Sequence, residues 1–315
     1  MPSEDKEGQT PSDSLGSYMV LWAKGFCMGA SDVVPGVSGG TMAFILGIYE
    51  ELIGAIRSFD LYSLRLALTL KIRSFLEYTR WKFLSAVILG ILTAVFSLAR
   101  LLDWLLINRP VMIWSFFFGL ILGSIVTVSR QVKRWNISSW SSLIAGILGA
   151  YILVGLVPVS TPNDLWFIFL SGAIAICAMI LPGISGSFIL VLLGKYQYVL
   201  NAVNQRDFVV LLVMALGACA GLAGFARVLS WLFREKHDLI VALLTGLMLG
   251  SLRKVWPWKE TLRSVMDSGG SVIPIVQANI FPPLWTSEVT AAVCLMVAGL
   301  AVVSSMACLA GRKQG

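Results

Sequence analysis

The chain has 315 residues, of which 57% are hydrophobic and only 13% charged, and its mean hydropathy is +0.83. A soluble domain carries about 25% charged residues, so this composition excludes a soluble enzyme or binding domain and indicates an integral membrane protein. The formal net charge of +7 does not predict a nucleic-acid partner, because the basic residues lie in loops between apolar runs, where they face anionic lipid headgroups.

Along the chain, the polar and acidic residues 1–17 predict a disordered cytoplasmic tail, because they lack the basic and apolar regions of a signal peptide. The rest divides into a first membrane repeat over 18–158 and a second over 159–312. A membrane-spanning helix needs about 20 apolar residues. Three clear candidates fall in each repeat: 83–106, 111–128 and 139–158, then 208–232, 238–252 and 287–309.

Each repeat also holds one apolar region that proline and glycine interrupt. The first interruption is Pro35-Gly36-Val37-Ser38-Gly39-Gly40, between 18–34 and 37–56. The second is Pro182-Gly183-Ile184-Ser185-Gly186-Ser187, between 165–181 and 184–201. We interpret each region as two half-helices that meet at a turn, as in a re-entrant hairpin. Two marginal full spans in each region are the alternative.

The two halves are copies of each other. Pro35, Gly47 and Tyr49 recur 147 positions later as Pro182, Gly194 and Tyr196. Gly90, Arg100 and Trp104 recur 127 positions later as Gly217, Arg227 and Trp231. The offset falls from 147 to 127 between Tyr49 and Gly90, so the first half has extra residues there. The basic segment 58–80 accounts for them. Its mixture of basic, leucine and aromatic residues predicts an amphipathic helix on the membrane surface.

The number of crossings decides how the halves are oriented. Each half holds three spans if its broken region is a hairpin and five if it is two spans, so the second half must be inverted. The expected fold is all-α: a polytopic membrane protein of two inverted-topology repeats, each with a broken (re-entrant) helix pair and three transmembrane helices. Basic residues in alternate loops predict that both termini are cytoplasmic and that 253–286 lies outside.

The breaks are the candidate binding site. A helix that restarts after a break presents free backbone N–H groups, and its dipole favours an anion such as phosphate. Glycine lets the ligand approach the backbone, and hydroxyl groups add donors. A kink that only aids packing is the alternative, but the duplication favours a site. The predicted substrate-binding residues are Ser38, Gly39, Gly40 and Thr41 in the first half, and Ser185, Gly186 and Ser187 in the second.

Four charged residues complete the prediction. Arg100 and Arg227 lie inside apolar runs, and an arginine at membrane depth usually has a function. We predict that they neutralise a bound phosphate; snorkelling to the headgroups is the alternative. Asp32 and Glu50, the acidic residues near the first break, are candidate coupling residues. The second half has no acidic residue at the equivalent positions, and Glu50 could equally lie at the level of the cytoplasmic headgroups.

The run Gly29-Ala30-Ser31-Asp32-Val33-Val34-Pro35-Gly36-Val37-Ser38-Gly39-Gly40-Thr41 resembles the signature of the PopT-type polyprenyl-phosphate transporter family, and Leu181-Pro182-Gly183-Ile184-Ser185-Gly186-Ser187 fits that family's second motif. The resemblance covers about residues 18–310. It implies a flippase that returns undecaprenyl phosphate, the lipid carrier for peptidoglycan and other envelope polymers, from the outer to the inner leaflet of the cytoplasmic membrane. The expected partners are the polyprenyl phosphate and the membrane, with ion or proton coupling; a homodimer is left open.

Two other functions stay open at this point. The same architecture could carry a small soluble anion, in which case a closed aqueous vestibule is expected. A membrane polyprenyl-diphosphate phosphatase can also use a Ser-rich re-entrant motif, but the histidine-dependent type needs a histidine nearby, and His237 is far from both breaks in sequence. The five cysteines are scattered singly, so no metal or other cofactor is expected. We therefore expect a transporter and not an enzyme.

Overall fold

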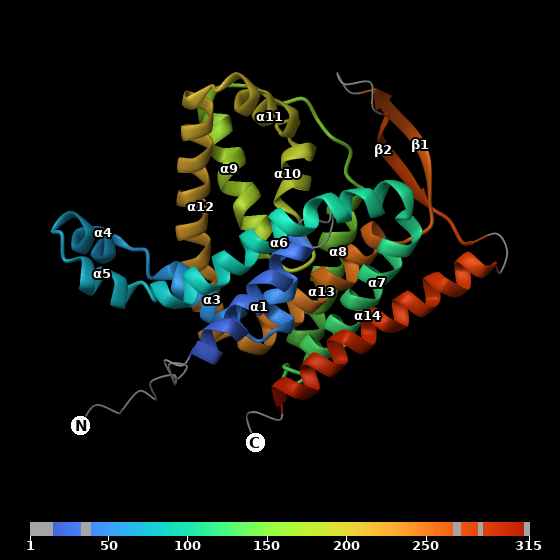
Figure 1. Ribbon diagram of the computed structural model, residues 1–315, viewed down its shortest axis with the longest axis horizontal. Coiled ribbons are helices and arrows are strands. Elements are labelled where there is room, and N and C mark those ends of the chain that lie inside the picture. Colours follow the sequence, from blue (N-terminus) through green and yellow to red (C-terminus); the bar gives the residue numbers. More distant parts are fainter. Residues whose placement is uncertain (1–14, 33–38, 267–271, 283–285, 312–315) are drawn as a thin grey trace.

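The computed structural model describes residues 15–32, 39–266, 272–282 and 286–311 (Figure 1); most of the predicted tail over 1–17 lies outside them. In the first half the helices are α1 (Leu15–Asp32), α2 (Gly39–Ile45), α3 (Tyr49–Arg57), α4 (Leu61–Leu68), α5 (Ile72–Tyr78), α6 (Trp81–Asn108), α7 (Pro110–Ser129) and α8 (Ile137–Gly155). The second half holds α9 (Leu165–Ile180), α10 (Gly186–Leu192), α11 (Tyr196–Gln205), α12 (Phe208–Glu235), α13 (His237–Val255), the strands β1 (Lys259–Met266) and β2 (Val272–Asn279), and α14 (Ser287–Gly311).

The local sequence accounts for where several helices begin and end. Pro110 is the first residue of α7, where its missing N–H needs no partner. Asp207 caps α12, because its carboxylate accepts a hydrogen bond from the N–H of Val210 at 3.2 Å. Gly47 and Gly194 follow α2 and α10 with φ angles of 67° and 63°. Glycine adopts this left-handed conformation without strain, so it ends both short helices.

The elements of the two halves match. The bounds of α2 and α10 are 147 positions apart, and α6 and α12, each of 28 residues, are 127 positions apart. The packing repeats as well, since α1 lies along α6 as α9 lies along α12. Gly90 and Gly217 lie against the backbone carbonyls of Trp22 and Phe169, where a Cβ atom would clash. Small residues at equivalent places therefore let both helix pairs pack closely.

The halves are interleaved. Helix α8 of the first half packs on α13 of the second, α14 of the second packs on α7 of the first, and α7 contacts α13. Helix α13 lies in the middle of the molecule (Figure 1) and buries side chains such as Leu244 and Met248 completely. Each half therefore completes the core of the other.

Among the described residues, five helices are long and apolar enough to cross a membrane, or up to seven if each of the bent pairs α2–α3 and α10–α11 is one span. The five are α6, α7, α8, α12 and α14, so five of the six clear spans that the sequence predicts are confirmed. The sixth falls in α13, which carries Asp238, Arg253 and Lys254 and is not among the five. A polytopic helical membrane protein with two broken helix pairs is confirmed, while the inversion of the halves stays a prediction.

Three features differ from the sequence prediction. The second arm of each break, expected as one half-helix over 37–56 or 184–201, is bent by 118° or 102°, because a left-handed glycine interrupts it. The segment 58–80 forms two short helices, α4 and α5, which project from the body (Figure 1). Within 253–286, β1 and β2 pair as an antiparallel hairpin that the sequence does not predict.

Candidate functional site

The structure joins the two breaks to each other. The backbone N–H of Gly183, in the second break, donates a hydrogen bond to Thr41 Oγ1 of α2 at 3.0 Å. The hydroxyl of Tyr49 on α3 donates to the carbonyl of Ile180, at the end of α9, at 3.0 Å. Both hydrogen bonds are buried. The two motifs, far apart in sequence, therefore lie side by side in the fold.

At the first break, an acidic side chain lies at the start of α2. Asp32, the last residue of α1, accepts a hydrogen bond from the N–H of Gly39 at 2.6 Å. A Cβ atom on Gly39 would collide with the same carboxylate. Gly40 is half-buried and Thr41 is buried, whereas Ser38 lies outside the described residues. The Gly39 amide, a predicted phosphate ligand, thus has an anionic partner within the protein, and a predicted coupling residue lies directly at the break.

The second break combines a tight glycine turn with two hydroxyl groups. Gly183 has a φ angle of 87° and packs against α13, where Ser251 Oγ lies 2.8 Å from the position that a Cβ atom would take. Gly186 is buried against the backbone of α9. The Oγ atoms of Ser185 and Ser187 lie 2.8 Å apart, and Ser187 is exposed. These hydroxyl groups are accessible to a ligand.

The two predicted arginines are not joined to the breaks by any hydrogen bond or ion pair within the described part of the chain. Arg100 is exposed on α6. Arg227 is exposed on α12, where its Nη1 donates to the carbonyl of Ala223 at 3.1 Å. It also lines a surface pocket of about 780 Å³ together with Asp60, Phe75 and other residues at α4 and α5. Arg227 therefore faces the projecting helices of the first half.

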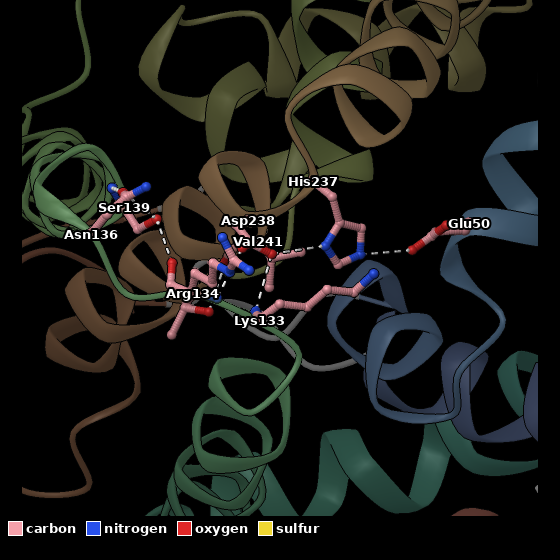
Figure 2. A network of polar contacts seen from close by, with 9 residues as sticks. Glu50, Lys133, Arg134, Asn136, Ser139, His237, Asp238 and Val241 are labelled. Carbon is pink, nitrogen blue, oxygen red and sulfur yellow. Dashed lines mark hydrogen bonds and ion pairs between the residues drawn. The ribbon is translucent and has the colours of Figure 1, made fainter.

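The other predicted coupling residue, Glu50, faces the one histidine of the chain (Figure 2). Glu50 Oε1 lies 3.5 Å from His237 Nε2, and His237 Nδ1 lies 3.4 Å from Asp238 Oδ1. The Asp238 carboxylate also accepts hydrogen bonds from the backbone N–H groups of Lys133 at 3.1 Å and Arg134 at 3.0 Å. This network connects α3, the start of α13 and the loop between α7 and α8, so the two predicted coupling residues belong to different networks.

The sequence matches known proteins over most of its length. A family model described as VCA0040-like, undecaprenyl phosphate translocase-like, matches residues 28–273. The chain belongs to this family. It is 44% identical to a polyprenyl-phosphate transporter from Vibrio cholerae over 293 residues, which cover 91% of this chain and 95% of that protein. It is 31% identical to a polyprenyl-phosphate transporter from Staphylococcus aureus over 257 residues, or 76% of this chain and 86% of that protein. No solved structure matches.

The region that matches the translocase-like family also contains a buried cation, Lys195, that the sequence analysis does not single out. Lys195 is 1% exposed, and its Nζ donates to the carbonyl of Thr161 at 2.8 Å and to Asn163 Oδ1 at 2.6 Å. It ties the bend between α10 and α11 to the segment before α9. In the sequence, Lys195 stands out only when the two repeats are compared, because the equivalent position in the first half is the apolar Ile48.

Proposed function

We propose that this chain is a polyprenyl-phosphate transporter of the cell membrane that returns undecaprenyl phosphate from the outer to the inner leaflet. The match to an undecaprenyl phosphate translocase-like family and the identity to two polyprenyl-phosphate transporters support the substrate class. The observation that carries the proposal is the hydrogen bond between Thr41 and Gly183, which brings two helix breaks together. Paired broken helices form the substrate sites of many transporters, because irregular backbone at membrane depth must line a cavity or be buried in protein.

In this proposal the two repeats are inverted, both termini are cytoplasmic, and one break serves each leaflet. The phosphate passes the breaks while the prenyl tail stays in the lipid. The hydroxyl groups of Ser185 and Ser187 and the backbone around Gly40 and Thr41 supply hydrogen bonds to the headgroup. The chain moves its substrate without cleaving it, since His237 contacts Glu50 and Asp238 and not the Ser-rich break.

The proposed function is tested with the purified full chain in liposomes that contain a fluorescent polyprenyl phosphate. A membrane-impermeant quencher reports which leaflet holds the lipid. We expect faster exchange between leaflets than in protein-free liposomes, and no acceleration for the corresponding prenyl alcohol. Uptake of inorganic phosphate without lipid movement would instead identify a carrier of small anions. Release of phosphate from a polyprenyl diphosphate would identify an enzyme.

Loss of the Asp32 carboxyl group should abolish coupling. In the Asp32→Asn variant the amide oxygen can still accept the hydrogen bond from Gly39, so the break keeps its geometry while the ionisable group is lost. We expect transport that no longer responds to an imposed pH or sodium gradient. The measurement is leaflet exchange with and without each gradient. If the Asp32→Asn variant still showed gradient-driven transport at the wild-type rate, Asp32 would have no part in coupling.

Loss of either predicted arginine should abolish transport of the lipid phosphate without removing the protein from the membrane. Arg100 and Arg227 are exposed, so their replacement by alanine leaves the core intact. The matched control is Arg73→Ala, because Arg73 is exposed and pairs with Glu77 on the same short helix at 3.1 Å. Leaflet exchange is measured at equal amounts of folded protein. A wild-type rate of leaflet exchange in both variants would show that the two arginines only contact lipid headgroups and do not bind the substrate.

A further inference from the structure

Two lysines lie against aromatic rings where α7, α10, α13 and β1 meet. Lys254, near the end of α13, holds its Nζ 5.0 Å from the centroid of the Phe188 ring. Lys259, the first residue of β1, holds its Nζ 4.5 Å from the centroid of the Trp114 ring. Lys259 Nζ also donates a hydrogen bond to the backbone carbonyl of Lys254. Two ammonium groups are thus fixed in one small region.

Among the described residues, no acidic group balances the charges of these lysines. Both side chains belong to half-buried residues, and within the described part of the chain no carboxylate lies at ion-pair distance from either of them. Burial and, as a smaller effect, the like charge of Lys254 together lower the pKa of Lys259 to about 8. Aromatic faces attract a cation only weakly, and a partly buried charge without a counter-charge is unfavourable. A bound anion would relieve both the desolvation and the repulsion.

The lysines lie beside the second break. Phe188, under the Lys254 ammonium group, directly follows Ser187 in the chain. Ser251, one helical turn before Lys254, packs against the turn at Gly183. The hairpin that begins at Lys259 lies at the end of the molecule opposite to the start of α1 and the end of α14 (Figure 1). A ligand that contacts the lysines is therefore adjacent to the break from that end.

We propose that Lys254 and Lys259 bind a phosphate group and deliver it to the second break. A phosphomonoester carries a charge of about −1.5 to −2 at pH 7, which matches two ammonium groups, and its oxygens accept their hydrogen bonds. The rings of Phe188 and Trp114 hold the two side chains in place. The identity of the ligand as a lipid rests on the proposed function; the phosphate chemistry is shared with inorganic phosphate.

The test is binding of farnesyl phosphate and of inorganic phosphate to the full chain in phosphatidylcholine nanodiscs, by isothermal titration calorimetry. The Lys254→Met/Lys259→Met variant keeps the aliphatic contacts with the rings and removes both charges. We expect it to bind farnesyl phosphate more weakly by about 10-fold or more, because each lost charged hydrogen bond carries that order of affinity. The Lys→Arg pair should retain binding. The control is Lys236→Met, an exposed lysine at the other end of α13.

The two probes distinguish the sources of the phosphate. A loss seen for farnesyl phosphate alone supports a lipid headgroup site, and an equal loss for inorganic phosphate supports a site for the free anion. Unchanged binding of both probes to the folded double variant would overturn the proposal and leave two lysines that only anchor the hairpin. If the double variant does not fold, Lys254→Gln alone is used with the same criteria.

Failure of this inference is separable from failure of the proposed function. If the wild-type chain moves polyprenyl phosphate between leaflets and the double variant binds and transports it normally, the lysine site is excluded and the function stands. If the double variant loses phosphate binding while the wild-type chain moves no polyprenyl phosphate, the site stands and the function is excluded.

Discussion

Replacing Gly39 or Gly186 with valine should stop transport of polyprenyl phosphate. A side chain at position 39 displaces the Asp32 carboxylate from the Gly39 N–H, and a hydrogen bond to a charged group contributes about 1.5–3 kcal/mol. A side chain at position 186 meets the carbonyl of Ala175 on α9, 2.7 Å from the Cβ position, and such overpacking costs about 1–3 kcal/mol. Each change moves the helix that follows a break, so transport should fall to the protein-free level.

The control for both variants is Gly149→Val, because Gly149 is exposed on α8 and no atom lies within 4 Å of its Cβ position. Leaflet exchange is measured at equal amounts of protein that elutes as a single folded species. Normal exchange by both Gly39→Val and Gly186→Val would mean that the breaks are kinks for helix packing and do not contact the substrate. A loss in only one variant would assign the site to one half.

The repeat and its breaks are predictable because they depend on local sequence. A proline that is followed by several glycines and serines within an apolar run interrupts a helix, and the offset of 147 between Pro35 and Pro182 marks the two copies. The matching bounds of α6 and α12 follow from the same duplication. Hydropathy is less decisive for the span predicted over 238–252, because the helix that contains it, α13, carries Asp238, Arg253 and Lys254 at its ends and is not among the five long apolar helices.

The rest depends on contacts between residues that are distant in sequence. The hydrogen bond of Gly183 to Thr41 needs both halves to be folded, and the pairing of α8 with α13 and of α14 with α7 crosses the boundary between the repeats. The sequence shows Asp32 near the first break but not that its carboxylate accepts the Gly39 N–H. In the sequence, Lys254 and Lys259 stand out only as basic residues in a segment, 253–286, that the predicted topology places outside, where few basic residues are expected.

Replacing Thr41 with valine should weaken both folding and transport. Valine has nearly the same shape but no hydroxyl oxygen, so the buried N–H of Gly183 loses its acceptor. An unsatisfied buried donor costs about 1–3 kcal/mol. We expect a lower midpoint of thermal unfolding and slower leaflet exchange. Tyr49→Phe should have a smaller effect of the same kind, because it leaves a carbonyl rather than an N–H without its partner.

The matched control is Thr245→Val on α13. Thr245 is also buried, but its hydroxyl donates to the Val241 carbonyl of its own helix at 2.7 Å, so valine leaves no backbone donor unpaired. If the two breaks move as one unit, either substitution alone already weakens the contact between them. The loss of stability and of leaflet exchange in the Thr41→Val/Tyr49→Phe double variant should then be smaller than the sum of the losses in the single variants. Additive losses would show two independent contacts. Transport by Thr41→Val equal to that of Thr245→Val would show that the hydrogen bond joining the breaks has no part in the transport cycle.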